Sequence, residues 1–266
     1  MSALLGELIA TGSRSKVYSW GADAVAKVPD PSTPDEWIYA EAVFTEAVGS
    51  AGAPAPSFLG IEQVNGRAAS IYERIDGPSM WRCVVEQPGR AAHFGRVLAD
   101  VQGALFALAP PVGLPNQRDR LTSKIRLAAQ HHHLKLEDSL ALVPIRLGPL
   151  RLCHGDLHPA NIIMSRNGPI IVDWFDASAG DRLADVARTM LLLSPSDGAN
   201  PSHLPGASLA TLASLFDAYR ARIERLFSPD RGLRTSWRRV EEIAQLSERA
   251  PTSLTLLQGG KASDVA

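Results

Sequence analysis

The stretch 152–176 constrains the fold more than any other part of this sequence, because polar groups stand there at fixed offsets among strand-forming apolar residues. Two short apolar runs, 162–164 and 170–172, flank Asn167-Gly168, a dipeptide typical of two-residue hairpin turns. We therefore predict a β-hairpin, which brings the start of its first strand beside the end of its second. The polar residues of the stretch are His154, Asp156, Asn161 and Asp173.

The oxygen atoms of this predicted hairpin indicate its chemistry. Asn161 stands at the start of the first strand and Asp173 at the end of the second, just past the loop that carries Asp156. Two carboxylates and a carboxamide oxygen that converge on one point suit a hard divalent cation, which binds oxygen ligands. One carboxylate would remain to act as a general base. The alternative is that both aspartates only cap turns.

These residues also resemble a known motif. His-Gly-Asp-Leu-His-Pro-Ala-Asn, followed by Ile-Val-Asp-Trp, is similar to the paired signature of the aminoglycoside phosphotransferase and choline kinase family, relatives of the protein kinases. Asn161 follows Asp156 by five residues, as in the protein-kinase catalytic loop. The resemblance implies an α+β, bilobal protein-kinase-like fold, with a small antiparallel sheet lobe and a larger, mainly helical lobe. It also implies ATP and Mg²⁺ as cofactors.

The resemblance assigns roles to the motif residues. It makes Asp156 the catalytic base that accepts the proton of an attacking hydroxyl, and it makes Asn161 and Asp173 the ligands of Mg²⁺. Asp185, in a later Gly-Asp-x-x-x-Asp-x-Ala segment, would brace the catalytic loop without touching the substrate. We interpret His154 and His158 as hydrogen-bonded scaffold residues.

Near the N-terminus, two apolar runs that read as strands flank the turn 11–16. Such a turn can lie over the phosphates of a nucleotide, through the backbone N–H groups near Gly12 and the hydroxyls of Ser13 and Ser15. It has one glycine, so a complete G-x-G-x-x-G pattern is missing. A plain hairpin is the alternative.

Lys27 lies within the next apolar strand, where an unpaired ammonium group would be costly, so we expect an anionic partner. A helix should begin at the capping box 33–36 and stop near Gly49. Glu41 shares the face of this helix that packs on the sheet, and Glu46 is the second choice of partner. The resemblance implies that the Lys27–Glu41 pair holds the α and β phosphates of the nucleotide.

The segment 73–78 interrupts the strand pattern, and helical patterns follow it. We therefore predict an N-terminal nucleotide-binding lobe, 1–75, and a C-terminal helical lobe, 76–266, that holds the catalytic loop and the acceptor site. The resemblance makes the crossover a hinge for adenine, bonded by the C=O of Glu73 and the N–H of Ile75. A bare linker is the alternative. The main helices of the second lobe are expected at 94–108, from 121 to about 132, at 207–227 and at 230–249.

Composition limits the possible partners. The chain has 266 residues, of which 45% are apolar and 21% charged, and its net charge of −1 gives no reason to expect nucleic acid as a partner. No apolar run approaches the roughly 20 residues that cross a bilayer, and the N-terminus lacks the pattern of a signal peptide. We expect a cytoplasmic monomer or dimer, with no membrane partner. Cys83 and Cys153 are expected to be reduced, buried thiols.

The predicted function is transfer of the γ-phosphoryl group of ATP to a hydroxyl acceptor that is a small molecule, with antibiotic resistance as one expected role. A metabolic kinase of a sugar or amino alcohol is one alternative, and a non-catalytic nucleotide-binding or interaction protein on the same fold is another. Residues 217–239 contain seven arginines against three acids. We therefore expect an acceptor less cationic than a typical aminoglycoside.

Overall fold

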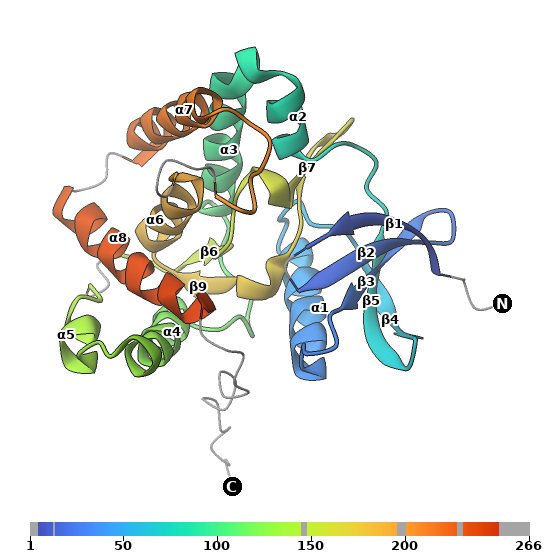
Figure 1. Cartoon of the computed structure of the whole chain (residues 1–266), viewed down its shortest axis with the longest axis horizontal. Coiled ribbons are helices and arrows are strands. Elements are labelled where there is room, and N and C mark those ends of the chain that lie inside the picture. The colour runs from blue at the N-terminus through green and yellow to red at the C-terminus, as the bar shows by residue number, and fades with distance from the viewer. Residues whose placement is uncertain (1–4, 13, 145–147, 196–200, 228–230, 250–266) are drawn as a thin grey trace, which may run out of the picture.

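In the computed structural model, residues 5–12, 14–144, 148–195, 201–227 and 231–249 are described, without the side chains of 231, 233, 234 and 249. The N-terminal part is an antiparallel sheet of five strands in the order β1-β2-β3-β5-β4. Helix α1 (Asp35–Ser50) lies beside this sheet, and most of the other helices lie on the side of α1 away from the sheet (Figure 1). The strands are β1 (Leu5–Thr11), β2 (Ser15–Trp20), β3 (Ala24–Pro29), β4 (Phe58–Val64) and β5 (Arg67–Glu73).

Strands β4 and β5 are joined by a two-residue turn of the kind that Asn-Gly predicts. Val64 pairs with Arg67, which leaves Asn65 and Gly66 as a two-residue loop. Both have positive φ, 50° and 79°, as a turn of type I′ requires. Asn and Gly adopt this backbone conformation at low cost, so the local sequence alone predicts this connection.

Helix α1 corrects one detail of the sequence prediction. It begins at Asp35 behind Pro34, and no side chain caps its first turn, so the expected capping box is wrong. The Thr33 hydroxyl instead donates to the backbone oxygen of Arg14, 3.4 Å away, because the strand turn lies within reach. The residues buried on its inner face are Ile38, Ala42, Thr45 and Val48.

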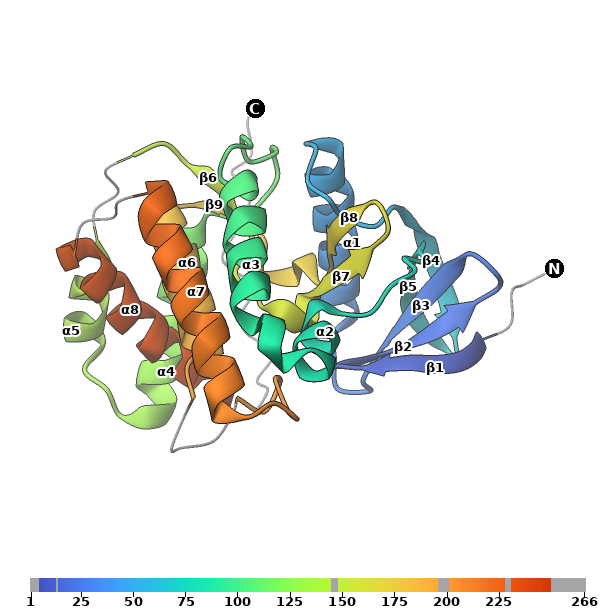
Figure 2. The same ribbon diagram turned by 90° about the horizontal axis from the view of Figure 1, so that it is seen from above.

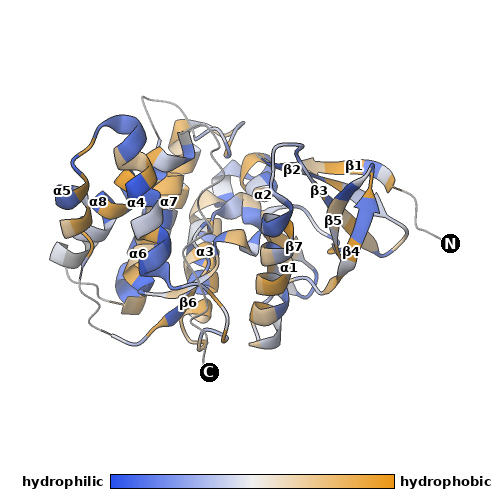
Figure 3. Ribbon diagram, turned by 90° about the horizontal axis from the view of Figure 1, so that it is seen from below, coloured by the Kyte–Doolittle hydropathy of each residue, from blue (hydrophilic) through white to orange (hydrophobic). Residues whose placement is uncertain are grey.

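The larger part of the chain is mainly helical, and the four predicted helices are all present. Their surfaces carry both hydrophilic and hydrophobic residues along their length, as amphipathic helices do (Figure 3). None of the helices in the described ranges is long and apolar enough to cross a membrane. The helices are α2 (Met80–Glu86), η1 (Pro88–Arg90), α3 (Ala91–Leu105), α4 (Gln117–His132), α5 (Leu136–Ala141), η2 (Pro159–Asn161), η3 (Trp174–Asp176), α6 (Arg182–Leu193), α7 (Leu209–Phe227), α8 (Arg231–Leu246) and η4 (Ser247–Arg249).

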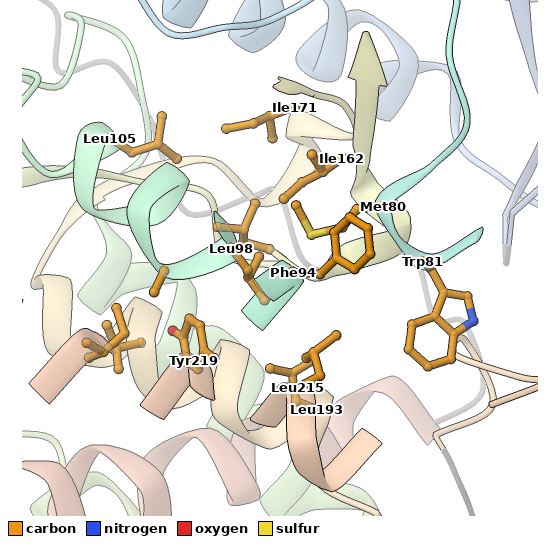
Figure 4. Close-up of a cluster of buried hydrophobic side chains, with 14 of the residues drawn as sticks. Met80, Trp81, Phe94, Leu98, Leu105, Ile162, Ile171, Leu193, Leu215 and Tyr219 are labelled. Atoms are coloured by element: carbon orange, nitrogen blue, oxygen red, sulfur yellow. The ribbon is translucent and has the colours of Figure 1, made fainter. Parts of the chain in front are cut away.

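The predicted hairpin is confirmed as β7 (Ile162–Ser165) and β8 (Gly168–Ile171). Its loop is Arg166-Asn167 and not Asn167-Gly168, because Ser165 pairs with Gly168. Ile162 and Ile171 are fully buried and share one apolar cluster with side chains of α2, α3 and α7 (Figure 4). This burial attaches the hairpin to the helices. Two short strands, β6 (Arg151–Cys153) and β9 (Ser178–Gly180), pair at the base of the motif.

The crossover between the sheet and the helices runs along this hairpin (Figure 2). The Met164 N–H donates to the backbone oxygen of Pro78, and Ser79 forms a bridge with Ile163. The predicted α+β fold, with a small antiparallel sheet and a larger helical part, is confirmed. The exact division after residue 75 stays a prediction. Cys83 and Cys153 are buried and form no disulfide.

Candidate active site

The loop that carries Asp156 is held from behind by its neighbours. Gly155 has φ 79°, and a Cβ atom there would lie 2.4 Å from the backbone oxygen of Asp176, so only glycine fits. The Gly155 N–H donates to Oδ1 of Asp185 over 2.7 Å. Nε2 of the fully buried His154 lies 3.1 Å from the backbone oxygen of Val172. Asp185 therefore braces the loop, and His154 connects it to the end of the hairpin.

Asp156 is a partly exposed carboxylate surrounded by donors. Its Oδ1 accepts a hydrogen bond from Nη2 of Arg188 at 3.0 Å, and its Oδ2 accepts one from Nδ2 of Asn161 at 3.4 Å. Nε2 of His158 lies 3.6 Å from Oδ2. Burial by itself would raise the pKa of Asp156, but His158 and the Arg188 charge outweigh it and hold this pKa well below its usual value. The group is therefore ionised and able to accept a proton.

The hairpin joins Asn161 to the strand end that precedes Asp173. The Val172 N–H donates to the backbone oxygen of Asn161 over 3.0 Å, and Nδ2 of Asn161 also bonds the backbone oxygen of Asp156. Asp173 has φ 66°, in the left-handed region, and its side chain is 44% exposed. A carboxylate at such a bend projects toward the sheet, where it meets Lys27.

Lys27 is bound by two carboxylates, one from each side of the site. Its Nζ lies 2.5 Å from Oε1 of Glu41 and 3.0 Å from Oδ1 of Asp173. Burial would lower the pKa of Lys27, but Asp173 and Glu41 together raise it above its usual value. The expected Lys27–Glu41 pair is present, and Glu46 is exposed instead. The ammonium group thus links the sheet to the end of the hairpin.

The turn between β1 and β2 lies close to the same edge. The Gly12 N–H donates to the backbone oxygen of Ser15 over 2.8 Å, whereas Ser13 lies outside the described residues. The Arg14 guanidinium lies 5.3 Å from the ring centre of Trp37, and that ring lies 5.2 Å from the ring of Phe175. Phe175 belongs to the short helix η3 (Trp174–Asp176), which directly follows Asp173.

The two expected hinge residues lie where the sheet ends. Glu73 is the last residue of β5, and its Oε2 accepts a hydrogen bond from the Ser57 hydroxyl over 2.8 Å. Ile75 follows in the crossover and is half-buried. Tyr72, just before them, is buried. Contacts of Glu73 and Ile75 with a nucleotide stay predictions.

Several residues of the site were missed in the sequence. Arg188, on α6, follows Asp185 by one helical turn and therefore shares its face, which is the signal that could have identified it. Gln102 of α3 supports Asp185, since its Nε2 donates to Oδ2 of Asp185 over 2.9 Å. Tyr219 of α7 donates in turn to Gln102. These contacts join helices that are distant in the sequence.

The arginines between 217 and 239 do not support the argument built on them. Three of their side chains pair with acids on the helix surfaces, Arg220 with Asp217, Arg222 with Asp100 and Arg238 with Glu242, over 2.7–3.1 Å. The side chains of Arg231 and Arg234 lie outside the described residues. The net charge of this segment therefore says nothing about the acceptor.

An antiparallel sheet with a Lys–Glu pair, joined by one crossover to a mainly helical part in which the Asp156–Asn161 loop lies between β6 and β7, defines the protein-kinase-like class of folds. The chain belongs to the phosphotransferase enzyme family, whose model matches residues 7–246. No curated protein sequence matches it significantly.

Solved structures agree with this fold assignment. An aminoglycoside-3'-phosphotransferase of type VIII superposes with a TM-score of 0.60 at 19% identity, over 91% of this chain and 93% of its own. Aminoglycoside phosphotransferase APH(3'')-Id from Streptomyces rimosus gives 0.59 at 20% identity, over 88% and 91%. A choline/ethanolamine kinase family protein from Mesorhizobium loti gives 0.56 at 17% identity, over 91% and 77%. The predicted family and the kinase-like fold are confirmed.

Proposed function

We propose that this protein transfers the γ-phosphoryl group of ATP to a hydroxyl group of a small molecule. One observation carries the proposal: Lys27 reaches from the sheet to Asp173, while Asn161, bonded to the residue before Asp173, also bonds Asp156. A phosphate-binding cation and an ionised carboxylate are thus connected through a single hairpin. Phosphoryl transfer depends on positioning and charge neutralisation, which such a connected set supplies.

ATP would bind along the edge of the sheet. Lys27, oriented by Glu41, contacts the phosphates, and the turn from Gly12 through Ser13 to Ser15 covers them. The Glu73 C=O and the Ile75 N–H would bond the adenine ring. Support comes from structures of the same fold: APH(3'')-Id has been solved with ADP and streptomycin, and an amicoumacin kinase with AMP-PNP.

The residues present fit a magnesium ion. Mg²⁺ is usually held by one or two carboxylates together with substrate phosphates, so a large protein cage is unnecessary. Asp173 offers a half-exposed carboxylate, and Asn161 offers a carboxamide oxygen beside the same strand end. No group of three or more His, Cys, Asp or Glu in the described ranges could hold a metal by itself. When bound, the ion would neutralise the charge of the phosphates.

The reaction needs one proton acceptor on the protein. The acceptor hydroxyl oxygen forms a bond to the γ-phosphorus while the bond from that phosphorus to the β,γ-bridging oxygen breaks, and ADP leaves. The hydroxyl proton passes to the carboxylate of Asp156, which is 27% exposed. Arg188 and Asn161 orient this carboxylate, and Asp185 holds the loop beneath it.

The acceptor remains open between an aminoglycoside-type antibiotic and a metabolic sugar or amino alcohol. The fold neighbours include kinases of both kinds. A non-catalytic protein on this fold would be expected to have lost a residue of the set, whereas Lys27, Glu41, Asp156, Asn161 and Asp173 are all retained.

Measurement of ADP release with ATP, Mg²⁺ and a panel of hydroxyl compounds tests the proposal. We expect acceptor-dependent ADP release that requires Mg²⁺ and disappears in Asp156→Asn. The exposed Asp119→Asn is a matched control, because Asp119 lies in the first turn of α4 and not in this site. Failure to bind ATP with Mg²⁺ would contradict the proposal.

A further inference from the structure

Arg188 connects the proposed base to the C-terminal end of the described chain. Its side chain is buried, with 5% of the residue exposed. Nη2 lies 3.0 Å from Oδ1 of Asp156 and 2.7 Å from Oε1 of Glu248, a residue of η4. Nε is also buried, and it has no hydrogen-bond partner among the described residues. The guanidinium group therefore has one buried N–H donor left beside its contacts with Asp156 and Glu248.

The other acids near Arg188 are the buried Glu241 and Asp176, and Asp176 already has cationic partners. Asp176 lies 3.2 Å from Nζ of Lys124 and 3.5 Å from Nη2 of Arg120. Lys124 also lies 3.8 Å from Oε1 of Glu248. An ammonium group of an acceptor that approached these acids would stand close to the Lys124 and Arg188 charges, which repel it.

We propose that Arg188, together with Lys124, binds a carboxylate group of the acceptor, and that Glu248 occupies this anion site when no acceptor is bound. The proposal rests on the proposed function and names its substrate class, a hydroxyl compound that carries a carboxylate. A carboxylate already lies against both cations, so the site has the charge and the geometry for one.

Replacement of the Glu248 carboxylate by an acceptor carboxylate costs less than removal of Glu248 from Arg188 without a replacement. If Glu248 left without replacement, the buried guanidinium would lose one of its two ion pairs and keep only the one with Asp156, which is costly. An acceptor carboxylate restores the second bond. Glu248 can move aside because its side chain is 31% exposed and it belongs to the one-turn helix η4.

The geometry also limits where the hydroxyl lies on the acceptor. Asp156 and Glu248 bind the same Nη2 atom of Arg188, so their carboxylates lie within the width of one guanidinium group. A hydroxyl that reaches Asp156 is then only a few bonds from the acceptor carboxylate. Small hydroxy acids satisfy this condition, whereas extended polycationic aminoglycosides do not.

Matched compounds that differ in one charge test the inference. The first set is glycerate, glycerol and 3-amino-1,2-propanediol, and the second is glucuronate, glucose and glucosamine. We measure ADP release and, by calorimetry with a non-hydrolysable ATP analogue and Mg²⁺, binding. The carboxylate member should have the highest kcat/KM or affinity, by about tenfold or more within a set.

Two variants separate the anion site from a general charge effect. Glu248→Gln removes the competing charge and should lower the KM or Kd for the carboxylate compound by about tenfold. Glu242→Gln is the matched control, since Glu242 lies nearby on α8 but pairs with Arg238 at the surface. It should leave that constant unchanged.

Each other outcome has a definite meaning. If neutral or amine members react best, or if Glu248→Gln does not strengthen carboxylate binding, the anion site is wrong and the proposed function stands. If ATP binds with Mg²⁺ but no member of either set reacts or binds, the anion site is again overturned. If ATP does not bind, the proposed function fails and this inference fails with it.

Discussion

The substitution Asp185→Asn tests how the catalytic loop is held. Asp185 is 1% exposed, and its two oxygens have different partners. Oδ1 accepts from the Gly155 N–H at 2.7 Å, and Oδ2 accepts from Nε2 of Gln102 at 2.9 Å. Asparagine has one acceptor oxygen, so its amide nitrogen would face the Gln102 nitrogen, donor against donor. Turning Gln102 over would relieve this clash only if the Tyr219 hydroxyl changed from donor to acceptor and the Thr189 hydroxyl from acceptor to donor.

The expected loss follows from these contacts. One charge-assisted hydrogen bond disappears. The asparagine amide and the Gln102 amide also face each other as two buried donors without an acceptor. Each effect costs about 1–3 kcal/mol. Burial raises the pKa of Asp185, which means that its charged form is poorly solvated. Removal of the charge therefore offsets part of the lost stability. We expect a fall of about 3 kcal/mol in the free energy of unfolding, measured in urea at pH 7. kcat should fall as well, because Gly155 precedes Asp156.

A second substitution makes this reasoning refutable. In Gln102→Glu/Asp185→Asn the new carboxylate can accept from the asparagine nitrogen and from Tyr219, so at least half of the lost stability should return. Gln102→Glu alone places two carboxylates together and should also destabilise the protein. Additive effects of the two single substitutions would refute the proposed contact. Asp119→Asn, which is exposed, should change stability by no more than about 0.5 kcal/mol.

Three further predictions concern single residues. Asp156→Asn should reduce turnover by about 10²- to 10⁴-fold while nucleotide affinity stays nearly unchanged; more than a tenth of wild-type turnover would contradict its role as base. Asp173→Ala should abolish the Mg²⁺ dependence of nucleotide binding in titrations with and without the ion, and an unchanged dependence would transfer the role to Asp176. Burial raises the pKa of Glu241 from 4.5 to about 7, so its contribution to stability is complete below pH 4.5 and is lost as the pH rises toward 7. In the Glu241→Gln variant this decline should be absent, and at pH 8 the variant should be more stable than wild type by up to about 3 kcal/mol. Equal pH profiles of the two proteins in denaturation would show that Glu241 titrates normally.

The sequence determined the parts of this protein that depend on neighbours along the chain. Asn65-Gly66 adopts the positive φ values of a tight turn, and the apolar runs around residue 167 form the expected hairpin. The pairing of Lys27 with Glu41 was also predictable, because a cation within an apolar strand requires an anion and the next helix presents one. The motif around Asp156 was sufficient to predict the family.

Only the tertiary structure decided which distant groups complete the site. The capping box at Thr33 failed because the N-cap of the helix is Pro34, whose ring has no side-chain acceptor, and the fold turns the Thr33 hydroxyl toward the Arg14 carbonyl instead. Arg220, Arg222 and Arg238 have surface partners that the charge count of residues 217–239 does not reveal. Arg188 meets Asp156 and Glu248 only because α6 packs between the catalytic loop and the C-terminal segment. Hydrogen bonds and ion pairs act over a few ångströms in space, so their partners are set by packing and not by position in the sequence.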